Sequence, residues 1–207
     1  MKSDVIVDTE TFVRSTLDKD GTGHDWWHCV RVRNTAVKLA HEEGAEVRIV
    51  ELSALLHDIA DHKFHGGDKE VGPRIAKEFL EAQGVEREVV EHVANIIRHM
   101  SWSTSKEGNR AFDSLEMRIV QDADRLDAIG AIGIARCFAY SGHAGRPLYD
   151  PTTDGEYNTS ALQHFQDKLF KIRDSLHTAS ARNIAQERHV YMKEYVARFH
   201  DEWGGIV

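Results

Sequence analysis

Apolar residues recur at intervals of three and four along most of the chain, which is the period of an amphipathic α-helix. Glycines follow several of these stretches and supply stop signals. The pattern predicts an all-α fold, with helices over about residues 4–17, 24–43, 46–61, 69–83 and 89–100, then 115–140 with a bend at Gly130, and finally 159–177 and 180–202.

Two stretches lack this period. Residues 101–112 have the composition of a loop, and residues 141–158 form a long irregular segment, a length at which loops usually carry function. Neither stretch has the composition of a linker, and no internal repeat is present. The chain of 207 residues is therefore expected to form a single domain over residues 1–207.

The predicted third helix is apolar on nearly every side and is expected to lie at the centre of the fold. Near its end, His57 and Asp58 interrupt the apolar run. Burying an unpaired charge costs several kcal/mol. These two side chains therefore need a partner that compensates for their burial.

Polar residues take inward positions in two other predicted helices. Asp122 falls on the apolar stripe of the helix that begins near Leu115, and His28 lies between Trp27 and Cys29. One buried histidine is usually a hydrogen-bonded core residue, but two imidazoles and two carboxylates form a suitable shell for a divalent cation. The same shell accepts manganese, iron, nickel, cobalt or zinc, so the pattern leaves the metal open.

Charge and composition exclude several classes of protein. The net charge of −8 argues against non-specific binding of nucleic acid. No apolar run approaches the roughly 18 residues of a membrane span, and the N-terminus has no signal-peptide core. Cys29 and Cys137 lie far apart among apolar neighbours, as reduced thiols do, so we expect a cytoplasmic protein.

Four longer segments carry a family resemblance: GHDWWH (23–28), ALLHDIADHK (54–63), RIVQDADRLDAIGAIGIAR (118–136) and GRPLY (145–149). The chain resembles the HD superfamily of metal-dependent phosphohydrolases, whose H…HD…D signature matches His28, His57, Asp58 and Asp122. It looks like a bacterial subgroup that includes a manganese-dependent pyrophosphohydrolase of deoxynucleoside triphosphates. The resemblance implies a helical bundle with a metal-binding core over about residues 20–150 and a C-terminal helical part over about 158–204.

The resemblance also implies one divalent metal ion, for which Mn²⁺ is the first choice and Fe, Ni, Co, Zn or Mg are the alternatives. It further implies a nucleotide substrate that is cleaved by metal-activated water. Asp61 matches a position that is usually Glu in the family and is the candidate for proton transfer. A simple hydrogen bond to histidine remains the alternative for this shorter side chain. The candidate substrate contacts, each of which could instead form a structural ion pair or hydrogen bond, are Arg31, Lys63, His99, Arg125 and Arg146.

Two other functions stay open. An HD-type di-iron oxygenase would use His92 and His99, although both lie in one predicted helix, whereas such enzymes generally take the extra histidines from different helices. A catalytically silent nucleotide-binding module is the third hypothesis, and the complete four-ligand set argues against it. A homodimer is also left open.

Overall fold

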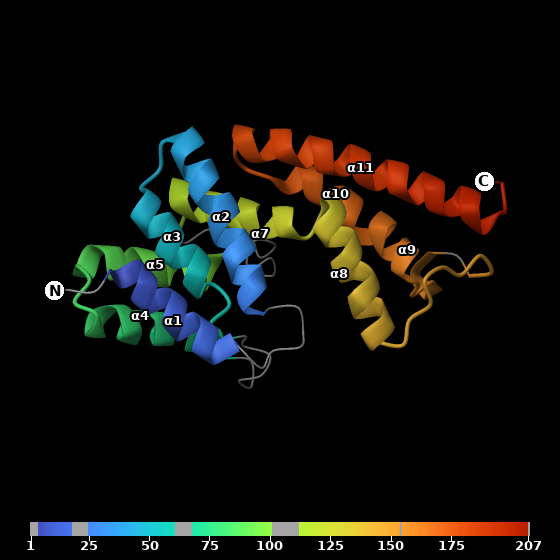
Figure 1. Cartoon of the computed structure of the whole chain (residues 1–207). Helices are drawn as coiled ribbons and strands as arrows, with labels where there is room; N and C mark the ends of the chain where they lie inside the picture. The colour runs from blue at the N-terminus through green and yellow to red at the C-terminus, as the bar shows by residue number, and fades with distance from the viewer. Residues whose placement is uncertain (1–3, 18–24, 61–67, 101–111, 154, 207) are drawn as a thin grey trace. The chain divides into compact units, whose positions relative to one another are not determined.

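The structure is a computed structural model that describes residues 4–17, 25–60, 68–100, 112–153 and 155–206. Every regular element within these ranges is helical (Figure 1). The predicted all-α fold class is therefore confirmed. None of the described helices is both long enough and apolar enough to cross a membrane.

The chain divides into two compact units, residues 1–123 and residues 124–207. The division falls inside one helix, α7, so no linker separates the units. The prediction of one domain over residues 1–207 stays a prediction. The helices that begin in the first unit are α1 (Val5–Leu17), α2 (Trp26–Glu43), α3 (Val47–Leu56), α4 (Val71–Ala82), α5 (Arg87–His99) and α7 (Leu115–Asp127).

Helix α3 is the centre of the first unit, as its apolar sequence predicts. It packs against α1, α2 and α5 (Figure 1). Leu52, Leu55 and Leu56 are fully buried in a core that also includes residues from α1, α4 and α5. Burying a leucine side chain stabilises the fold by roughly 1.5–3 kcal/mol, so these residues fix α3 firmly in place.

The predicted end of this helix at residue 61 is wrong. Helix α3 ends at Leu56, and His57 and Asp58 lie in the turn that follows. The amide of Ile59 donates to the carbonyl of Leu56 at 3.1 Å, a bond between residues three apart that tightens the turn.

The second unit is also helical but less regular. The bend predicted at Gly130 is a complete break, since α7 ends at Asp127 and a new helix begins at Gly130, whose φ is 78°. Its elements are α8 (Gly130–His143), η2 (Gly155–Tyr157), α9 (Ala161–His164), η3 (Phe165–Leu169), α10 (Phe170–Ile172), η4 (Arg173–Ser175) and α11 (Ala179–Trp203).

The predicted helix over residues 159–177 is divided into these short pieces, with a π-helical turn at η3. Phe165, Leu169 and Ile172 are all buried, so the irregular turns still direct the apolar side chains inward. The irregular segment predicted at 141–158 begins only after α8 ends at His143. It is held by its own hydrogen bonds, including two from the Asn158 side-chain amide to backbone carbonyls.

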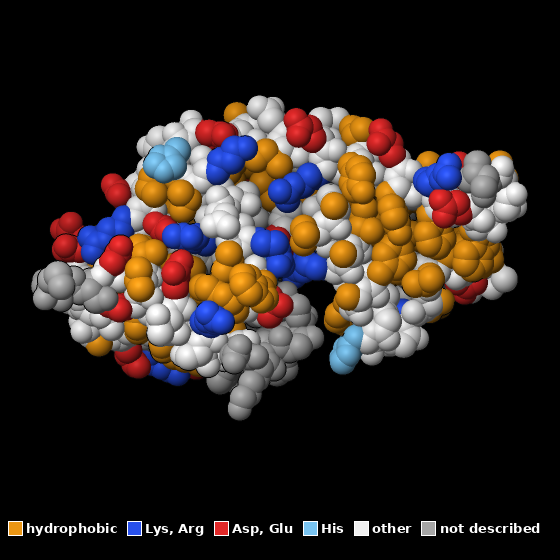
Figure 2. Space-filling view, viewed as in Figure 1, with side chains coloured by type: hydrophobic (Ala, Val, Ile, Leu, Met, Phe, Trp, Pro, Cys, Tyr) orange, Lys and Arg blue, Asp and Glu red, His pale blue; other side chains and the backbone are white. Residues whose placement is uncertain are grey.

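Hydrophobic side chains cluster on the face of the second unit that Figure 2 shows. The most exposed large ones near its C-terminal end are Trp203 and Ile206. Aromatic rings of α8 and α11 pack together in the same unit, with the stacked centroids of Phe138 and Phe199 6.2 Å apart. This aromatic packing stabilises the unit around α11.

Candidate metal centre

Three side chains of the first unit converge on one point. The Nε2 atoms of His28 and His57 lie 3.2 Å apart. Asp58 Oδ2 lies 3.3 Å from the His28 Nε2 and 3.2 Å from the His57 Nε2. The three potential ligand atoms therefore form a nearly equilateral triangle at the start of α2 and the end of α3.

The triangle has the dimensions that a divalent cation needs. Ligand atoms bonded about 2.1 Å from one ion lie about 3.0 Å apart at right angles and about 3.4 Å apart at tetrahedral angles. The observed separations of 3.2, 3.2 and 3.3 Å fall between these limits. Two imidazoles and a carboxylate are also the donor types that divalent transition metals prefer. The residues present thus fit a bound divalent cation.

Backbone contacts orient the His57 ring for this role. His57 Nδ1 lies 2.8 Å from the carbonyl oxygen of Ala54, where an N–H at Nδ1 donates to that oxygen. This tautomer leaves a lone pair on Nε2, the atom that faces His28 and Asp58. A hydrogen bond from the other ring nitrogen is the usual support of a metal-binding histidine.

The three side chains differ in how far they are exposed to solvent. The side chain of His28 is 0% exposed and that of His57 is 2% exposed, whereas that of Asp58 is 24% exposed. The carboxylate therefore lies on the edge of the cluster that solvent can reach.

Asp122 is fully buried on α7, so its predicted inward orientation is confirmed. It lies outside the group whose ligand atoms all fall within 4.8 Å of one another. Its part as a fourth metal ligand stays a prediction. The neighbouring Gln121 donates from its side-chain amide to the Met100 carbonyl at 2.9 Å and thereby joins α7 to the end of α5.

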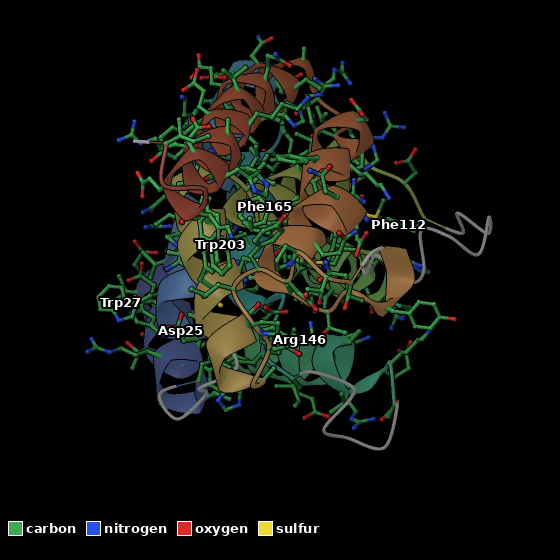
Figure 3. All side chains as sticks on the ribbon, turned by 90° about the vertical axis from the view of Figure 1, so that its right-hand side faces the viewer. Asp25, Trp27, Phe112, Arg146, Phe165 and Trp203 are labelled. Carbon is green, nitrogen blue, oxygen red and sulfur yellow. The ribbon has the colours of Figure 1, made fainter. Side chains whose placement is uncertain are left out.

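The other predicted site residues are spread over the chain. Asp61 and Lys63 lie outside the described residues. Arg31 is half-buried on α2. Arg146 is exposed in the loop after α8 (Figure 3), with its guanidinium 5.6 Å from the centre of the Tyr140 ring.

Arg125 belongs to the second unit and bonds within it. Its guanidinium donates to the Ser175 carbonyl at 2.6 Å and lies 2.9 Å from His177 Nε2. These contacts give Arg125 a structural part in connecting the end of α7 to the segment before α11. Its predicted contact with substrate stays a prediction.

The two histidines of α5 take different positions. His92 Nε2 lies 3.0 Å from the Ser114 hydroxyl and 3.4 Å from Glu116 Oε2 at the start of α7. His99 stacks on Phe112 with ring centroids 6.0 Å apart, and partial burial lowers its pKa. Within the described ranges, neither histidine belongs to a cluster of metal-type donors, and the cluster of His28, His57 and Asp58 is the only one.

Sequence reasoning missed one residue beside the cluster. Asp25 is the N-cap of α2, and its side chain accepts a hydrogen bond from the His28 amide (Figure 3). The signal was available, because aspartate directly before an amphipathic helix is a typical N-cap. Trp27, which directly precedes His28 in α2, points away from the ribbon, and its side chain is 62% exposed.

Comparison with known proteins agrees with this arrangement. The HD domain family model matches residues 26–129, which include His28, His57, Asp58 and Asp122. The chain therefore belongs to the HD domain family, and the resemblance in the sequence is confirmed. One similar protein is an HD-superfamily hydrolase from Bacillus thuringiensis, which is known from a crystal structure. That structure has a TM-score of 0.81 and 41% identity, and the match covers 99% of each chain.

Bacillus subtilis YpgQ is a second similar protein. It is 37% identical over 196 residues, which cover 95% of this chain and 92% of YpgQ. The crystal structure of YpgQ in complex with ADP has a TM-score of 0.78 and 36% identity, with 95% of this chain and 94% of that chain covered. These likenesses place the chain in a bacterial subgroup of HD proteins.

Proposed function

We propose that this protein is a divalent-metal-dependent phosphohydrolase that cleaves a nucleoside triphosphate into a monophosphate and pyrophosphate. The observation that carries the proposal is the triangle of His28 Nε2, His57 Nε2 and Asp58 Oδ2, with edges of 3.2 to 3.3 Å. In an HD protein these residues would hold the metal, with Asp122 as the fourth ligand. Manganese is the metal we expect.

A bound divalent cation would polarise a phosphoryl oxygen and lower the pKa of water at the site. The protein supplies the remaining parts of the reaction. His57, held through Nδ1 by the Ala54 carbonyl, and the fully buried His28 provide rigid neutral donors. Asp58 supplies negative charge at the accessible edge, and Asp61 is our candidate to move the proton of the attacking water.

Cationic side chains and one histidine would bind the phosphates. Arg31 and Lys63 lie close in sequence to the proposed ligands, and Arg125, Arg146 and His99 are further candidates. Arginine suits this part because its planar guanidinium donates two parallel hydrogen bonds to phosphate oxygens. The choice of a nucleotide is supported by the similarity to YpgQ, which binds ADP in its crystal structure.

The test is a product assay on purified protein with Mn²⁺ and a panel of nucleoside mono-, di- and triphosphates. Pyrophosphate and orthophosphate are measured separately. We expect equal amounts of pyrophosphate and nucleoside monophosphate from a triphosphate. Asp58→Ala and Asp122→Ala are expected to lose at least about a thousandfold in turnover, because each change removes a charged metal ligand.

Asp68→Ala is the matched control. Asp68 is an exposed acid before α4 whose carboxylate pairs with Arg74 at 3.6 Å, outside the cluster. It should retain wild-type turnover. Orthophosphate released from monophosphates would change the substrate class and keep the metal chemistry. An absence of turnover on every nucleotide would refute the proposal, and oxygen consumption with two irons per chain would replace it by the oxygenase hypothesis.

A further inference from the structure

One carboxylate binds the backbone of a proposed metal ligand. Asp25 Oδ1 accepts a hydrogen bond from the His28 amide at 2.8 Å. The backbone carbonyl of Asp25 lies 3.1 Å from the same amide and 3.3 Å from the amide of Cys29. Asp25 therefore holds the His28 main chain from both its side chain and its own main chain.

The backbone of Asp25 is already in the conformation that this role requires. With φ −78° and ψ 172° it is extended, as an N-cap residue is, and α2 begins at the next position. His28 is the third residue of that helix, and its ring is fully buried. Fraying of the first turn would therefore move the His28 imidazole away from His57 and Asp58.

The charge of Asp25 adds a second effect. The N-terminus of a helix carries a partial positive charge, which disfavours a cation placed nearby. The first turn of α2 contains no acidic residue, so within that turn no other carboxylate offsets this charge. The N-caps of α3, α4 and α5 are also acidic (Glu46, Glu70 and Glu86), whereas those of α9 and α11 are the neutral hydroxyl residues Ser160 and Thr178. What sets Asp25 apart is that its carboxylate caps a helix whose first turn carries a proposed metal ligand, where its negative charge offsets the helix dipole.

We propose that Asp25 is a positioning residue for the metal centre: it fixes the His28 backbone and offsets the helix dipole without itself contacting the cation. This inference rests on the metal site of the proposed function. It predicts that the loss of Asp25 weakens metal binding more than it weakens the fold. A cap with only a structural role would affect stability alone.

The experiment measures Mn²⁺ affinity by calorimetry, together with unfolding of the metal-free protein and hydrogen exchange of the His28 amide. Asp25→Ala is expected to lower the affinity at least about tenfold and to speed exchange at His28 by a similar factor, because a lost N-cap frees the first turn. Asp25→Ser keeps an acceptor in a neutral group, and Asp25→Asn keeps the shape without the charge. Both should recover protection at His28, with affinities between Ala and wild type.

Thr178→Ala is the matched control, because Thr178 caps α11 through its own side chain, which accepts from the Ala181 amide at 3.4 Å. It should lower the unfolding temperature as Asp25→Ala does and leave Mn²⁺ affinity unchanged. If Asp25→Ala does not fold, Asp25→Gly takes its place, since glycine is tolerated as an N-cap but has no side-chain acceptor.

The outcomes separate this inference from the proposed function. Wild-type affinity in Asp25→Ala or its Gly substitute, with Mn²⁺ binding lost in Asp58→Ala, would overturn the positioning role and leave the metal centre intact. An equal loss of affinity in Thr178→Ala would also overturn it, because the effect would then follow general stability. A wild-type protein that binds no divalent metal would overturn both proposals.

Discussion

The two units of the molecule treat buried polar groups in opposite ways. In the first unit, His28, His57 and Asp58 are drawn together, with their ligand atoms facing one another. In the second, buried Asp127 pairs with Arg136 at 2.7 Å. Electron-pair donors that converge in this way can hold a cation between them, whereas an acid beside an arginine is already compensated. The comparison teaches that the partners of a buried charge, more than its burial, distinguish a binding site from a structural contact.

Removal of metal should give the largest effect and should act on the first unit. Chelation is expected to abolish hydrolysis, and a return of Mn²⁺ should restore it. At a metal concentration 100 times the dissociation constant, binding adds about 2.7 kcal/mol to the free energy of unfolding. Calorimetric scans with and without Mn²⁺ measure this change. Identical unfolding of the two samples would contradict the metal centre.

Loss of the Arg136 charge tests the structural pair of the second unit. Arg136→Met leaves Asp127, only 5% exposed, without this ion pair. We expect the free energy of unfolding to fall by about 2 kcal/mol, below the usual 3–5 kcal/mol for a fully buried pair because Arg136 is partly exposed. Urea unfolding measures the loss, and Mn²⁺ affinity should not change.

Arg198→Met is the control for that experiment. Arg198 and Glu202 form an exposed pair four residues apart on α11, at 2.8 Å. Such helix pairs contribute about 0.3–0.5 kcal/mol. An equal effect of the two substitutions would contradict the distinction between the buried and the exposed pair.

Gly130→Ala should destabilise the fold by an amount comparable with loss of the Arg136 charge. Gly130 has φ 78°, and a Cβ there would lie 2.9 Å from Arg188 Cγ. The left-handed backbone alone costs an alanine about 1–2 kcal/mol. The clash adds to this, although the flexible Arg188 side chain, which donates to the Leu126 carbonyl, can shift to relieve part of it.

Gly145→Ala separates the two causes. Gly145 has φ 66° in the same unit, and a Cβ added there would meet nothing within 4 Å. It should therefore show the backbone cost without the clash, in the same urea experiment. If Gly130→Ala is no more destabilising than Gly145→Ala, close packing at Arg188 is not significant.

The smallest effect should be a pH dependence of the second unit. Burial, assisted by Arg173 and Lys193, lowers the pKa of His189, and burial also lowers the pKa of His164. In the unfolded chain these histidines have an ordinary pKa near 6.5. Below that pH the unfolded chain therefore binds more protons than the folded state does. Stability is therefore complete above about pH 6.5 and falls as the pH drops towards the lowered folded-state values.

His189→Phe should flatten this decline, because phenylalanine fills a similar space beside Phe170 without a titratable group. Thermal unfolding between pH 7.5 and 5 measures the slope. His200→Phe is the control, since His200 is exposed on the same helix. An unchanged slope in His189→Phe would exclude His189 as its source.

Local pattern predicted much of the fold and part of the site. The bounds of α1, α2 and α5 follow from helical periodicity and from stop signals such as Gly44, whose φ of 73° suits a helix end. The buried position of Asp122 followed from its place on an apolar stripe. These features depend on residues within a few turns of one another, which a sequence displays directly.

Contacts between distant residues could not be read in this way. The turn after Leu56 and the irregular pieces between Ala161 and Ser175 depart from the predicted helices. The bond from Arg125 to the Ser175 carbonyl joins residues 50 positions apart. Tertiary packing can override local helical preference at such points.

The sequence by itself determined three features: an all-helical chain, the buried α3, and the polar residues that interrupt apolar faces. It could do so because helical period and burial depend on the pattern of apolar residues within a few turns of one another. Only the tertiary structure decided which of these polar groups meet. It brought the Nε2 atom of His28 to within 3.2 Å of the Nε2 atom of His57, 29 positions later. It also paired Asp127 with Arg136 in an ion pair. The physical reason is that a side chain's partner depends on how helices pack, and packing joins residues that the sequence keeps apart.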